Sequence, residues 1–128
     1  MLRDDLFCYL RLLQAPGLPS EVRARMLGKL EKIVDAAVER DPARWKSYGL
    51  PPLGVVDSPA SPFARAFSSA IDLNLDFLLE TQDPDGSWKP TWSWGDAAPD
   101  AWETAKREWA GVLTRGALRI LGVFGRVT

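Results

Sequence analysis

The chain contains no histidine and only one cysteine, Cys8, among its 128 residues. Without histidine it cannot build the common zinc sites or a Ser-His or Cys-His pair for nucleophilic catalysis. A lone cysteine cannot form a disulfide within the chain. With Tyr9 and Leu10 beside it, Cys8 is expected to be a small, mostly buried core residue, the alternative being a reactive thiol. We therefore expect neither a metal site nor a cofactor.

Long apolar runs and a charge excess are also absent. No run approaches the roughly 20 apolar residues that a membrane span needs, and the start of the chain, residues 1–5, is too charged for a signal peptide. Lys and Arg together number 16 and Asp and Glu 17, so the net charge of -1 offers nucleic acid no overall attraction. These features predict a cytoplasmic protein with no membrane span and no nucleic-acid partner.

Helical periodicity is what the sequence has in abundance. Apolar residues recur at spacings of three and four through four segments, 2–14, 20–40, 62–82 and 100–127, and no segment has the alternation of a strand. The fold class expected is therefore all-α with four main helices. At this length the chain is expected to be one domain, 1–128, with helix pairs at 2–40 and 62–127.

Three helix starts are predicted from capping signals. Ser20 is expected to be the N-cap of the second helix, and Ser61 followed by Pro62 is expected to start the third. Asp100, with Glu103 three residues later, resembles a capping box at the start of the fourth. Between the two pairs lies a connector, residues 41–61, that contains Trp45. This tryptophan is expected either to pin the connector to the helices or to reach a binding cavity.

Five of the six tryptophans lie between positions 88 and 109, and the first of them ends an ordered series of residues. This series is Phe77, Leu78, three residues, Gln82, three residues, Gly86, one residue and Trp88. A glutamine amide can bond loose backbone groups at a helix end, glycine permits a positive φ in the turn, and tryptophan supplies a large flat surface.

This order of residues resembles the QW motif of the terpenoid cyclase and prenyltransferase superfamily, which includes squalene-hopene cyclase. A decayed second copy occurs earlier in the chain, where Tyr9 and Gln14 lie at one shared offset from Phe77 and Gln82, Gly17 follows, and Pro19 stands in place of the tryptophan. The resemblance implies an α/α toroid whose structural motif here is Phe77, Gln82, Gly86 and Trp88. Four helices fill only an arc of such a toroid, so the chain is expected to be a partial toroid. It would then be a C-terminal portion lacking an N-terminal half, or a subunit of a homo-oligomer.

The residues that would carry the family's chemistry are missing. Hopene-type cyclases protonate an alkene with an Asp-x-Asp-Asp cluster, and protein prenyltransferases hold zinc with Asp, Cys and His ligands; neither set occurs here. Asp72 and Asp76 are four residues apart and are expected on a solvated helix edge, the alternative being a catalytic pair. Asp83 and Asp85 fit a turn better than a calcium loop. If the chain were active it would be a cyclase-like or prenyltransferase-like enzyme, but its catalytic residues stay unknown.

The tryptophans are the candidate ligand-binding residues. In related cyclases aromatic side chains line the cavity, because their faces suit isoprenoid chains and carbocations. The residues expected to line such a cavity here are Trp88, Trp92, Trp94, Trp102 and Trp45. The alternative is that they only close the core between the third and fourth helices. The function expected is thus a cyclase-related protein or fragment that binds an isoprenoid or another apolar molecule, with a non-enzymatic interaction or self-association module as the alternative.

Overall fold

The fold is all-α, as the sequence predicts. The computed structural model describes residues 3–127, and these form four α-helices and two short 3₁₀-helices. The helices are α1 (Arg3–Leu13), α2 (Ser20–Ala37), η1 (Pro42–Arg44), η2 (Pro52–Gly54), α3 (Ser68–Glu80) and α4 (Pro99–Val123). Within the described residues no strand occurs, and the only β-type pairing there is an isolated bridge between Val38 and Leu50.

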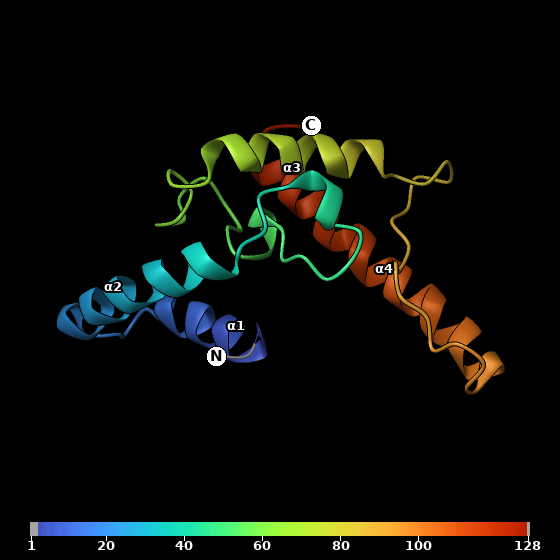
Figure 1. Cartoon of the computed structure of the whole chain (residues 1–128), viewed down its shortest axis with the longest axis horizontal. Helices are drawn as coiled ribbons and strands as arrows, with labels where there is room; N and C mark the ends of the chain where they lie inside the picture. The colour runs from blue at the N-terminus through green and yellow to red at the C-terminus, as the bar shows by residue number, and fades with distance from the viewer. Residues whose placement is uncertain (1–2, 128) are drawn as a thin grey trace.

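The helices are arranged as a hairpin and a crossing pair (Figure 1). Helices α1 and α2 lie side by side at one end of the molecule. Helix α3 lies above α4, whose C-terminal end passes beneath it while its N-terminal end projects away from the other helices. The segment 81–98 leaves α3 and runs back along the projecting half of α4. No helix in residues 3–127 is long and apolar enough to cross a membrane.

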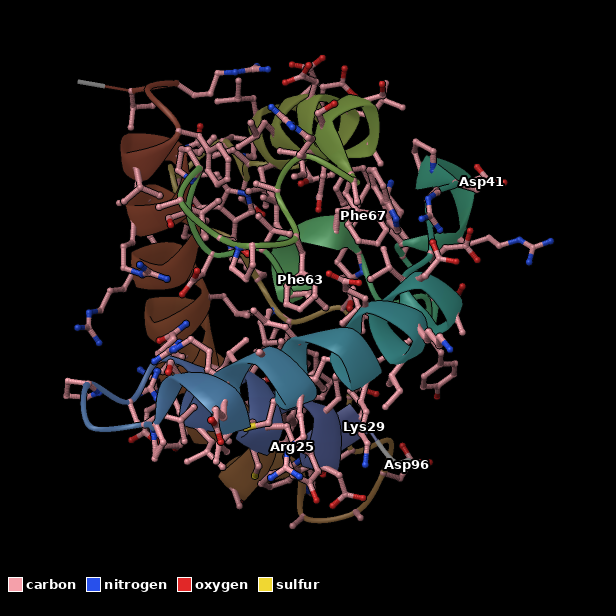
Figure 2. All side chains as sticks on the ribbon, turned by 90° about the vertical axis from the view of Figure 1, so that its left-hand side faces the viewer. Arg25, Lys29, Asp41, Phe63, Phe67 and Asp96 are labelled. Atoms are coloured by element: carbon pink, nitrogen blue, oxygen red, sulfur yellow. The ribbon has the colours of Figure 1, made fainter. Side chains whose placement is uncertain are left out.

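The hydrophobic core lies between the hairpin and the crossing pair, and the connector supplies much of it. Val34 of α2 and Val56 of the connector are fully buried. Phe63 and Phe67 lie between α2 and α3 (Figure 2), and the Arg40 guanidinium lies 4.4 Å from the centre of the Phe67 ring. The connector is therefore part of the core that joins the two helix pairs.

All three predicted capping sites are wrong in detail. Helix α3 begins at Ser68 because residues 62–67 form successive turns, in which Ala64 N–H donates to Ser61 O at 3.1 Å and Ser68 N–H to Arg65 O at 3.4 Å. Helix α4 begins one residue before Asp100, at Pro99, and its N-cap is Ala98 with a φ of 49°. Helix α2 already includes Ser20, and its N-cap is Pro19 without a side-chain cap.

Helix α1 corrects the prediction for Cys8, which is exposed. The helix buries Leu6 and Leu13, with Leu10 partly buried between them. Cys8 is two residues from Leu6 and from Leu10, so it falls on the opposite side of the helix. Tyr9, at 45% exposure, is also outside the buried stripe. The predicted start of this helix at Leu2 lies outside the described residues.

The side chain of Arg23, on α2, fixes the end of α1. Its guanidinium donates to the Leu13 carbonyl and, at 3.1 Å, to the Ala15 carbonyl. Carbonyls at a helix end have no partner within the helix, so this arginine supplies one from the neighbouring helix. Arg25 and Lys29 lie on the exposed side of α2, away from Phe63 and Phe67 (Figure 2). These two basic side chains therefore lie on a solvated face of α2.

The end of α4 is tied to α3. The helix ends at Val123, before the predicted residue 127, because Gly125 adopts a φ of 73° and Arg126 N–H returns to Leu121 O at 2.8 Å. Arg126 then pairs with Asp76 at 2.7 Å and with Asp72 at 3.7 Å. Both aspartates are thus on an exposed edge of α3, as the sequence predicts, and they support the crossing of the two helices.

Candidate functional site: an aromatic cleft between α3 and α4

The turn after α3 has the geometry that its residue types predict. Gly86 has a φ of 89°, and its N–H donates to Asp83 O at 2.8 Å. Asp83 N–H donates in turn to Ser87 O at 2.8 Å. The Gln82 side-chain amide donates to Gly86 O at 2.8 Å. The glutamine thus holds the turn closed, and the glycine adopts a conformation that other residues reach only with strain.

Trp88 joins this turn to both helices. Its indole N–H donates to Leu78 O of α3 at 2.9 Å, and its backbone N–H donates to Thr114 Oγ1 of α4 at 3.0 Å. The ring is buried, so its large apolar surface is removed from water while its single donor is satisfied. Trp88 is therefore a link between α3 and α4, and the turn positions it there.

Trp45 reaches the same region from the connector. Its indole N–H donates to Glu39 O at 2.7 Å, and its ring meets the Phe77 ring edge to face, with centroids 5.3 Å apart. Tyr48, three residues later, is 93% exposed. The two aromatics of the connector thus have different positions, and only the tryptophan packs against α3.

Trp45, Trp88 and Trp92 line one cleft of about 720 Å³. Its remaining apolar lining comes from the connector, α3 and α4: Pro51, Leu53, Phe77, Leu78, Val112, Leu113, Ala117 and Ile120. Gly116 also lines the cleft, and no atom lies within 4 Å of the position that a Cβ would take there. The absence of a side chain at Gly116 therefore leaves room inside the cleft.

Trp94 and Trp102, also predicted to line the cavity, are not among the residues lining this cleft. They pack on each other with ring centroids 5.2 Å apart, and Trp92 packs on Trp109 at 5.5 Å. Trp102 is buried, whereas Trp92 and Trp94 remain 42% and 46% exposed. The segment 88–94 thus joins α4 through two aromatic pairs, of which only the one containing Trp92 borders the cleft.

Charged residues line the rim of the cleft. Lys89 lies 3.0 Å from both Asp83 and Asp85, and hydrogen bonding to Asp85 raises the pKa of the lysine. The pKa of Asp85 is lowered to about 2, chiefly by the Ser87 hydroxyl at 2.6 Å, then by the Ser87 backbone N–H and by Lys89. Lys46 and Glu80 also line the rim. The ion pairs of Lys89 therefore help to close the turn beside the cleft.

Asn74 is a polar residue among the buried positions of α3. It is 3% exposed, lines the cleft, and accepts a hydrogen bond from Leu53 N–H at 2.9 Å. An asparagine at a position where the helical pattern calls for an apolar residue is a signal that could have identified it. The acidic residues give no comparable site: in the part of the chain that the structure describes, no group of three or more His, Cys, Asp or Glu residues could hold a metal ion.

The earlier, decayed copy of the motif has different contacts. Gln14 donates to Asp57 Oδ2 at 3.1 Å rather than to its own turn, and the φ of Gly17 is not positive. A smaller cavity of about 420 Å³ lies beside it, lined partly by Gln14, Arg23 and Asp57. It contains no tryptophan.

Comparison of the chain with protein-family models, with curated proteins and with solved structures finds no match.

Proposed function

We propose that this chain binds an isoprenoid or another elongated apolar molecule in the aromatic cleft, without independent catalytic activity. The observation that supports this most directly is the enclosure of about 720 Å³ by Trp45, Trp88 and Trp92. Ligand pockets typically have about 300–1,000 Å³ and are mostly apolar with few polar groups. Flat aromatic faces suit the double bonds of an isoprenoid chain.

A distant relation to the terpenoid cyclase and prenyltransferase superfamily, as part of an α/α toroid, belongs to the same proposal. Its support is the turn between α3 and α4, in which Gln82 bonds the Gly86 carbonyl and Trp88 bonds both helices. The sequence has neither the acid cluster nor the histidine that the family's two chemistries need. Binding is therefore proposed, and a reaction is not.

The binding proposal is tested by filling the cleft at Gly116. A leucine there meets no atom within 4 Å of its Cβ, and it extends into the space that a ligand would occupy. Replacing a helical glycine also favours the helix, by up to about 1 kcal/mol. Gly111→Leu is the matched control, because Gly111 is on the same helix with the same free space but does not line the cleft.

The measurement is the change in tryptophan fluorescence on titration with farnesol and geranylgeraniol. Three of the six tryptophans line the cleft, so a bound ligand alters their emission. We expect saturable binding by the unmodified chain and by Gly111→Leu, and at least tenfold weaker binding by Gly116→Leu. Equal binding by all three would place the ligand outside the cleft, and no saturable change in the unmodified chain would refute the proposal.

Self-association through α4 is the second candidate function. Near its middle, helix α4 exposes Trp109 and Val112, at 44% and 59%. Exposed Glu108 and Arg115 flank Val112 at helical spacing, and neither has a hydrogen bond or ion pair within the described residues. If two α4 helices cross antiparallel at Val112, Glu108 of each copy falls beside Arg115 of the other. This charge complementarity favours a second copy as the partner.

Charge reversal tests this pairing. Glu108→Arg and Arg115→Glu each place like charges together twice in the dimer, so each variant is expected to weaken association by at least tenfold. The double variant restores the opposite-charge pairs and is expected to recover association. Sedimentation velocity over a concentration series measures all four proteins. A monomer at every concentration, or a double variant as weak as the single ones, would exclude this arrangement.

A further inference from the structure

The cleft contains a buried hydrogen-bond donor that the protein itself does not use. Asn74 is 97% buried, and its Oδ1 is occupied by the Leu53 N–H at 2.9 Å, which fixes the orientation of the amide. Among residues 3–127 nothing accepts a hydrogen bond from its Nδ2. No fully enclosed side-chain nitrogen or oxygen in that part of the chain lacks a partner, so Nδ2 retains contact with open space. Because Asn74 lines the cleft, that space is the cleft.

The other donors on the cleft's side chains are already bonded or lie at its rim. The indole N–H groups of Trp45 and Trp88 donate to Glu39 O and Leu78 O, and the Thr81 hydroxyl donates to Phe77 O at 2.7 Å. The other donors that line the cleft belong to Lys46, Lys89, Thr91 and Trp92, and all four residues are exposed to solvent. An unbonded donor in an apolar enclosure is costly unless water or a ligand bonds it.

We infer that the ligand carries a neutral hydrogen-bond-accepting oxygen, as a ketone, ether or ester does, within an otherwise apolar chain, and that this oxygen bonds Asn74 Nδ2. A neutral acceptor is favoured over an anion because, among residues 3–127, no cationic side chain is buried beside Asn74, and burying an unpaired charge costs far more than burying a neutral oxygen. The inference depends on the proposed binding function, whose ligand class it narrows from any apolar molecule to one with this acceptor.

The test compares undecane with 2-undecanone, two chains of equal length that differ by the ketone oxygen. Affinities are measured by competition against a saturating fluorescent isoprenoid analogue. We expect the ketone to bind about fivefold to tenfold more tightly than the alkane, because one neutral hydrogen bond contributes this much when the donor is otherwise unpaired. Equal affinities, or no competition by either molecule, would overturn the inference and leave the binding proposal standing, whereas failure of the fluorescent isoprenoid analogue itself to bind saturably would overturn both.

Two variants locate the preference at Asn74. Asn74→Asp keeps the acceptor for Leu53 N–H but replaces the donor with an oxygen, and at pH 9 it is expected to remove the preference for the ketone. Asn74→Leu removes both groups and is expected to equalise the two affinities even if Asn74→Asp fails to fold. Thr91→Val, which removes a hydroxyl at the exposed rim, is the control and should keep the preference. A preference that survives in either folded Asn74 variant would contradict the assignment.

Discussion

The two helix ends at Gln14 and Gln82 carry the same order of residues and fold in different ways. At the later one, Gln82 bonds the Gly86 carbonyl and Trp88 bonds both α3 and α4. At the earlier one, Gln14 bonds Asp57 of the connector, and Arg23 from α2 bonds the Leu13 carbonyl at the end of α1 and the Ala15 carbonyl after it. A glutamine and a glycine after a helix are therefore insufficient for the closed turn, and the two sites differ both in the tryptophan and in the spacing between the glutamine and the glycine.

Removing the tryptophan should have the largest effect on this comparison. Trp88→Ala deletes a buried ring and removes the indole hydrogen bond to Leu78 O, so it is expected to lower the free energy of unfolding by about 3–5 kcal/mol. Pro19→Ala, at the equivalent position of the earlier copy, changes an exposed residue and should alter the free energy of unfolding by less than about 1 kcal/mol. Urea denaturation followed by circular dichroism measures both. Similar losses in the two variants would mean that Trp88 is not the distinguishing residue.

The glycines allow a sharper and smaller comparison. Gly86→Ala places a side chain on a backbone with a φ of 89°, so the free energy of unfolding is expected to fall by about 1–2 kcal/mol. At Gly17 the backbone is not left-handed, and no atom lies within 4 Å of the position that a Cβ would take. Gly17→Ala is therefore expected to raise the free energy of unfolding by about 0.5 kcal/mol, because alanine lowers the conformational entropy of the unfolded chain. The same denaturation experiment measures whether each variant lowers or raises the free energy of unfolding. A stabilising Gly86→Ala would show that the turn does not require this conformation.

The acidic end of the later turn should produce the smallest effect. The pKa of Asp85 is about 2 in the folded chain and 3.8 without its partners, so the stabilisation is present above pH 3.8 and is lost as the pH falls through about 2. The Ser87 hydroxyl is the main cause of this shift. Ser87→Ala should therefore raise the pKa of Asp85 toward 3.8. NMR titration of the Asp85 carboxyl carbon measures its pKa in both proteins. An unaltered pKa in Ser87→Ala would mean that another donor lowers the pKa of Asp85.

The helices and the later turn could be predicted because their signals are local. The apolar spacing of α1 to α4, the positive φ of Gly86 and the glutamine's contact with the turn all depend on residues close in sequence. The same spacing rule, applied more strictly, would have placed Cys8 on the exposed side of α1, since Leu6, Leu10 and Leu13 already define the buried stripe. The start of α4 is similar, because Pro99 marks the first helical position.

The site could be predicted only in part because its geometry is set by long-range contacts. Trp45 belongs to the cleft since its ring meets Phe77, and Trp94 is outside it since its ring meets Trp102. Nothing local distinguishes these two tryptophans. The start of α3 shows the same limit: Ser61 and Pro62 form a strong local start signal, but the chain makes turns there and Phe63 and Phe67 enter the core between α2 and α3.

The two aromatic pairs on α4 have an optical consequence. The indoles of Trp92 and Trp109 are at 80° with centroids 5.5 Å apart, and those of Trp94 and Trp102 are at 40° and 5.2 Å. Indoles this close and inclined to one another couple their electronic transitions, which produces paired circular dichroism bands of opposite sign. Release of the segment 88–94 from α4 would abolish these bands while the helical signal remained, so the packing of this one segment can be followed spectroscopically without any label.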